Sequence, residues 1–123
     1  MEKQEMQVII SAKKLMLHTI KLTSNINHYP KKYRHSVVDR MQIKSMDIYE
    51  ALMEANRTDL KNYKRDRQEM QTKAITYCDE LLTYIEMSQE LNFISQGSME
   101  HWSKMVLDVK RLSLAWRSKD KER

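Results

Sequence analysis

An apolar seam in residues 37–56 is the feature that most limits the folds open to this chain. Apolar or small residues recur there at steps of three and four, at Val38, Met41, Ser45, Ile48, Leu52 and Ala55. This spacing places all of them on one side of an α-helix, facing a neighbour along its whole length. The 123 residues include one glycine and one proline, too few for a turn-rich β fold or a glycine-rich phosphate loop. The sequence therefore predicts an all-α protein.

Three further helices are expected, over residues 4–27, 67–91 and 99–117. The first should end in the run that starts at Thr23, because Asn and Ser favour local turn bonds and Pro30 cannot continue a helix. Four helices joined by connections of moderate length favour an antiparallel up-down-up-down four-helix bundle, here a single domain over residues 1–123.

The helix ends and the core can also be read from the pattern. Ser36 and Asp39 have capping-box spacing, Ser98 is expected to cap the last helix, and residues 118–123 are expected to fray. Met6 belongs to the apolar side of the first helix. The third seam is Met70, Ala74, Tyr77, Leu81, Tyr84 and Ser88, with Cys78, Leu82 and Ile85 beside it, and the fourth is Met99, Trp102, Val106, Val109, Leu112 and Trp116. We expect burial of Val38, Met41, Ile48, Leu52, Leu81, Ile85, Val109 and Trp116.

The charge is segregated along a chain whose net charge is +5. Residues 68–100 hold one lysine and six acids, whereas residues 101–123 hold seven cations and three acids. This pattern suits docking or self-assembly between unlike faces, and neighbouring helices of one bundle could equally satisfy it. Residues 57–67 carry five cations and two acids, and they fit either a linker or the first turns of the third helix.

The sequence offers no support for catalysis. None of the four histidines has a glutamate three positions before it, and no zinc-protease motif occurs, so no catalytic, cofactor-binding or metal-binding residue is predicted. Cys78 is the only cysteine and has apolar neighbours at helical spacing, which indicates a core thiol and a reducing, cytoplasmic setting. No apolar run approaches the roughly 18 residues that span a bilayer, so no membrane association is expected.

Basic residues lie beside tyrosines in two places, in the segment Tyr29–Arg34 and around Tyr63. Cations neutralise phosphates and tyrosines stack on unpaired bases, so both places are candidates for binding RNA or DNA without sequence preference. A solvated polar linker, or a helix with Tyr inward and Lys outward, would give the same pattern.

Three motifs in order resemble a known family: Tyr29–Arg34, Glu54–Arg57, and Val109–Leu112 with Trp116. The chain resembles the small four-helix proteins encoded in intervening sequences of bacterial large-subunit ribosomal RNA genes. Within that group it is most similar to the accessory variability determinant proteins of diversity-generating retroelements. Relatives often carry glycine where this chain has Lys110 and Leu114.

The resemblance implies a non-catalytic accessory subunit that forms a homopentamer and binds the element's reverse transcriptase together with template RNA and complementary DNA. The alternative is a stand-alone bundle of the intervening-sequence type, with a structural or RNA-associated role. The resemblance makes Lys31, Lys32, Arg34, Arg57 and Arg111 candidate contacts for polymerase or nucleic acid. Their neighbours in the basic clusters complete the set of candidates: Lys61, Lys64, Arg65, Arg67 and Lys110.

Overall fold

The computed structural model describes residues 3–123, with side-chain environments from Gln7 onward. Met6 therefore lies outside the described side chains. The described residues form no strand, and their elements are α1 (Lys3–Thr23), the 3-10 turn η1 (Lys31–Tyr33), the π turn η2 (Arg34–Val38), α2 (Asp39–Arg57), α3 (Lys64–Glu90) and α4 (Gln96–Glu122).

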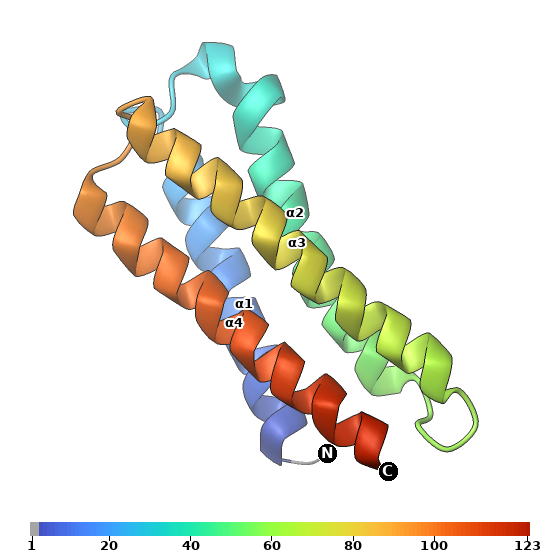
Figure 1. Ribbon diagram of the computed structural model, residues 1–123. Helices are drawn as coiled ribbons and strands as arrows, with labels where there is room; N and C mark the ends of the chain where they lie inside the picture. Colours follow the sequence, from blue (N-terminus) through green and yellow to red (C-terminus); the bar gives the residue numbers. More distant parts are fainter. Residues whose placement is uncertain (1–2) are drawn as a thin grey trace.

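The four long helices form the expected antiparallel bundle. Each packs against its neighbours in the chain, and α4 returns to pack against α1, so α1 and α3 lie on one diagonal and α2 and α4 on the other. Figure 1 shows the start of α1 and the C-terminus at one end of the bundle, together with the loop between α2 and α3. The α1–α2 and α3–α4 connections lie at the opposite end. Below we call these the terminal end and the linker end.

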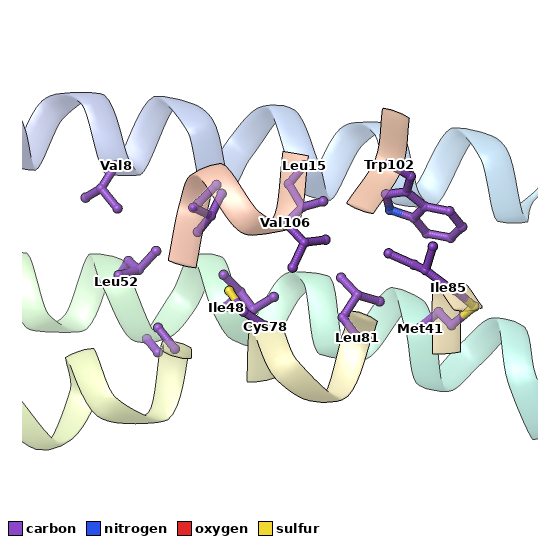
Figure 2. Packing of buried hydrophobic residues seen from close by; sticks show 14 of the residues in the cluster. Val8, Leu15, Met41, Ile48, Leu52, Cys78, Leu81, Ile85, Trp102 and Val106 are labelled. Atoms are coloured by element: carbon purple, nitrogen blue, oxygen red, sulfur yellow. The ribbon is translucent and has the colours of Figure 1, made fainter. Parts of the chain in front are cut away.

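The core consists of side chains from all four helices that point into the space between them (Figure 2). All eight residues that the sequence placed in the core are buried. Trp102 and Trp116 are its two largest buried side chains, and the buried Trp102 Nε1 donates to Thr19 Oγ1 at 3.0 Å. A polar group buried with a partner avoids the penalty of desolvation, so this bond fixes α4 against α1 at little cost.

The buried side of α3 is rotated relative to the expected seam. Met70, Tyr77 and Tyr84 are half-buried, while Gln71 and Cys78 have no exposed surface. The helix packs against both α2 and α4, so its buried residues lie between the two contacts. The expected seam is confirmed at Ala74, Leu81 and Ser88, which are fully buried.

Three of the helix ends that differ from the expectations are the end of α1 and the starts of α2 and α4. α1 ends at Thr23, and an Asx turn follows in which Asn25 Oδ1 accepts from the Asn27 N–H at 2.9 Å. The capping box at Ser36 was wrong, because the chain enters α2 from the π turn and no side chain caps it. Ser95, and not Ser98, caps α4: its Oγ accepts from the Ser98 N–H at 3.1 Å.

Candidate nucleic-acid interface

The basic segment before α2 forms an ordered turn and is not a flexible linker. Residues 31–38 pass through the 3-10 turn and the π turn directly into α2. Tyr29 is only 2% exposed, and its ring lies 5.1 Å from that of Phe93, centroid to centroid. The Tyr33 ring lies 4.9 Å from the same Phe93 ring. Two tyrosines of the segment are therefore anchored on one aromatic side chain of the α3–α4 connection.

Phe93 is itself held by the way α3 ends. The Phe93 N–H bonds to the Ser88 carbonyl at 2.8 Å and the Asn92 N–H to the Gln89 carbonyl at 2.9 Å, which is the Schellman pattern. Asn92 supplies the left-handed residue that this pattern requires, with φ of 62°. Asparagine adopts that conformation more readily than most residues, so this turn forms without a glycine.

The anchored turn presents three cations to solvent. Lys31, Lys32 and Arg34 are all exposed, and among the described residues none of them has a carboxylate partner. The Lys32 Nζ lies 5.2 Å from the centroid of the Tyr33 ring, a cation–π contact that leaves its charge at the surface. Cations on an ordered turn lose little conformational freedom when an anion binds, in contrast to cations on a flexible linker. We call these three residues the linker cations.

A hollow of about 300 Å³ lies beside the linker cations, between the end of α1 and the start of α2. Both polar and apolar side chains line it. The lining residues are Thr23, Ser24, Ile26, Tyr29, Pro30, Lys31, Arg34, Val38, Asp39 and Gln42.

The second basic cluster lies at the terminal end, as Figure 1 shows for the α2–α3 connection. The structure resolves the choice between linker and helix for residues 57–67: α2 ends at Arg57, residues 58–63 form a loop, and α3 begins at Lys64. Asp59 organises the loop by accepting from the backbone N–H groups of Lys61 and Asn62.

Most cations of this cluster have contacts within the chain. Arg57 pairs with Glu54 at 2.9 Å, Arg65 with Glu69 at 3.6 Å, and Lys64 Nζ donates to the Lys121 carbonyl at 3.1 Å. These side chains are largely at the surface, so such pairs exchange readily with solvent or with a phosphate.

Arg67 differs from the expectation of a surface contact. Its side chain is 7% exposed, and its Nε lies 2.7 Å from Oδ2 of Asp120, which is fully buried. The guanidinium also lies over the Trp116 ring at 4.9 Å and donates to the Thr58 carbonyl. Arg67 therefore acts as a structural cation of the core and is not part of the exposed cluster.

A groove between α3 and α4 brings the predicted Arg65 together with three cations that the sequence did not single out. It has a volume of about 470 Å³, and four of its lining residues are cations, namely Arg65, Lys73, Arg117 and Lys121. Glu69 is the one acid in the lining. Arg117 Nη1 donates to Thr72 Oγ1 at 3.1 Å, which fixes one cation across the groove. Only the packing of the two helices reveals this cluster, because its members come from segments some 45 residues apart.

The two candidates in the middle of α4 are engaged with nearby carboxylates. Lys110 Nζ lies 2.7 Å from Asp79 Oδ1 on α3, and Arg111 lies 3.9 Å from Asp108 one turn away. Arg111 is 70% exposed and Lys110 30% exposed. The Lys110–Asp79 pair links α3 to α4, so part of the segregated charge is neutralised between helices of one bundle.

Within the described residues, no group of three or more His, Cys, Asp or Glu side chains is arranged to hold a metal ion. Burial raises the pKa of the Cys78 thiol to about 12, and the neighbouring Asp79 adds to the effect while Lys110 opposes it. A thiol of that pKa is a poor nucleophile at neutral pH. Across the described chain, every helix is too short or too polar to cross a membrane.

The comparisons with known proteins give no relative: no family model, no curated protein and no solved structure matches this chain.

Proposed function

We propose that this protein is a non-catalytic accessory subunit of a diversity-generating retroelement. In this role it binds the reverse transcriptase and holds template RNA and complementary DNA through its basic surfaces. The observation that carries the proposal is the set of linker cations, which are exposed on a turn anchored by Tyr29 and Tyr33 and have no carboxylate partner among the residues that the structure describes. An internal structural role does not require three such cations on an ordered turn.

The position of the second basic surface supports the same proposal. Helix α2 separates the linker cations from Arg57, and its 19 residues at about 1.5 Å each give roughly 30 Å. A nucleic acid would touch both ends of one bundle only by running along it. In a ring of subunits each cluster would repeat around a rim, and many weak contacts would add up to useful avidity.

The homopentamer that the family resemblance implies is part of this proposal. A ring requires head-to-tail contacts between unlike faces, which the segregated charge of the chain favours. Light scattering should give a mass five times that of the 14.8-kDa chain at micromolar concentration. A monomer mass throughout that range would reject the ring.

The main test is the salt dependence of nucleic-acid binding. Wild-type protein should bind duplex DNA and structured RNA with little sequence preference, since phosphates carry no base identity. The logarithm of the binding constant should fall with the logarithm of salt concentration by a slope near −0.9 for each phosphate neutralised on duplex DNA. Replacing Lys31, Lys32 and Arg34 together by Gln should flatten this slope while the circular dichroism spectrum stays unchanged.

A matched control replaces Lys13, Lys14 and Lys104 by Gln. These residues are exposed within α1 and α4, outside both basic clusters, and their loss changes the net charge equally. If both triple variants weaken binding equally, general charge and not the linker site drives association. Co-purification with a reverse transcriptase encoded beside this gene separates the accessory subunit from a stand-alone bundle, since only the former retains the polymerase.

A further inference from the structure

We propose that the hollow beside the linker cations binds one unpaired nucleotide of a single strand, with its phosphate on Lys31 and Arg34. This inference rests on the proposed nucleic-acid binding and names the form of nucleic acid that this site recognises. The hollow lies between the end of α1, with the segment that follows it, and the turn that leads into α2. Its volume of about 300 Å³ is at the lower end of the range for small-molecule sites.

The phosphate side of the hollow is formed by Lys31 and Arg34. Both line the hollow, and among the described residues neither has an ion-pair partner. A guanidinium presents a planar fork of donors that matches two phosphate oxygens, and an ammonium adds a point charge. The lining contains one acid, Asp39, and its Oδ2 atom lies within hydrogen-bond distance of His35 Nδ1, at 3.0 Å.

Another part of the lining is a network of uncharged polar groups. Gln42 Nε2 donates to Thr23 Oγ1 at 3.0 Å and to Ser24 Oγ at 3.3 Å, and Thr23 Oγ1 donates in turn to the Thr19 carbonyl at 2.7 Å. This network holds the amide of Gln42 in place. In the described structure it leaves the Gln42 Oε1 acceptor and the Ser24 hydroxyl proton without partners. One fixed acceptor and one donor at the mouth of a hollow are suited to the edge of a base or to a sugar hydroxyl.

An apolar surface completes the site. Ile26 and Pro30 line the hollow and are exposed, and the buried side chains of Val38 and Tyr29 also line it. Nucleobases have apolar faces that stack on such surfaces, whereas an inorganic anion gains nothing from them. Cations, polar edge groups and an apolar face within one small hollow therefore fit a nucleotide better than a bare phosphate.

The backbone around the hollow also favours a binding role. Arg34 begins a π turn, and such turns are rare and occur often at functional sites. The turn adds one residue to the first turn of the helix, and Arg34 and Val38 at its two ends both line the hollow. A base stacked inside a duplex is not accessible to a hollow of this kind, so a single strand should bind better.

The test compares a single-stranded 12-nucleotide RNA with a blunt duplex of the same length at one salt concentration, by fluorescence anisotropy. Wild-type protein should bind the single strand at least fivefold more tightly. Gln42→Leu should abolish that preference and leave duplex affinity unchanged, because it removes the polar wall and no charge. Ser24→Ala, at an exposed position, should weaken only single-strand binding and serves if Gln42→Leu fails to fold.

Competition identifies the chemistry of the occupant. A nucleoside monophosphate at millimolar concentration should displace the single strand, and inorganic phosphate at the same concentration should not. Equal displacement by both would overturn the nucleotide site in favour of a simple anion site. The inference also fails if the single strand and the duplex bind equally tightly and Gln42→Leu changes neither affinity. Salt-dependent binding of the duplex would in that case still support the proposed function. Loss of binding to every nucleic acid would reject both.

Discussion

Arg67 Nε lies 2.7 Å from Asp120 Oδ2 in the interior of the terminal end, 53 residues apart in the sequence. Gln71 Nε2 also donates to Asp120 Oδ2 at 2.8 Å, and the Arg67 guanidinium covers the Trp116 ring. The pair joins the first turn of α3 to the last turns of α4, and the Arg67 bond to the Thr58 carbonyl adds the loop after α2. This network explains why α4 continues to Glu122, where the sequence suggested a frayed tail.

The first prediction concerns this ion pair. Arg67→Leu should lower the free energy of unfolding by about 3–5 kcal/mol, because it leaves the buried carboxylate of Asp120 with the longer contact to Arg123, 3.9 Å away, in place of the pair at 2.7 Å. Urea denaturation followed by circular dichroism measures the loss. Arg65→Leu, two residues away and 92% exposed, should change it by less than about 0.5 kcal/mol. A loss below about 1 kcal/mol for Arg67→Leu would mean that the pair is dispensable.

The second prediction concerns Trp116. This side chain is fully buried beneath the Arg67 guanidinium, so Trp116→Ala should cost about 3–5 kcal/mol of unfolding free energy. Leu114→Ala on the same helix, at a position 36% exposed, is the matched control and should cost much less. Equal losses in the two variants would argue against Trp116 as a core residue.

The third prediction concerns Phe93, on which Tyr29 and Tyr33 pack. Phe93→Ala should cost about 2 kcal/mol of unfolding free energy, less than the 3–5 kcal/mol typical of fully buried rings, because Phe93 is only half-buried. It should also weaken nucleic-acid binding, although no charge changes, since the turn that carries the linker cations loses its anchor. Unchanged affinity, measured by fluorescence anisotropy, would show that the anchor does not contribute to binding.

The fourth prediction concerns the thiol of Cys78, whose pKa burial raises to about 12. Native protein should not react with a thiol reagent at pH 8, and should react fully in denaturant. The native state keeps a proton that the unfolded state loses near pH 9, so the thiol's contribution to stability is complete below pH 9. It should decline by about 1.4 kcal/mol per pH unit between pH 9 and 12.

Cys78→Ala provides the control for this decline, because it lacks the titrating group and should have a flatter stability profile from pH 9 upward. Rapid labelling of native protein at pH 8 would contradict burial of the thiol. The chain has no second cysteine, so the label reports this position alone.

Local sequence determined the class of fold and most of the core. The steps of three and four identified four helices, and Val38, Ile48, Leu81 and Trp116 are buried as expected because helical periodicity alone decides which residues share a face. The positions of the cations at both ends of α2 also followed from the sequence, since a helix of known length fixes the separation of its ends.

Tertiary structure decided what became of the individual polar residues. Arg67 belongs to a basic run in the sequence, yet it is buried because Asp120 lies opposite it on another helix. Residues 28–35 read as a linker, yet they form an ordered turn because Tyr29 and Tyr33 meet Phe93 of the α3–α4 connection, which lies at the same end of the bundle. Such pairings depend on which faces of distant helices are brought together, and periodicity within one segment carries no information about a partner 50 or more residues away.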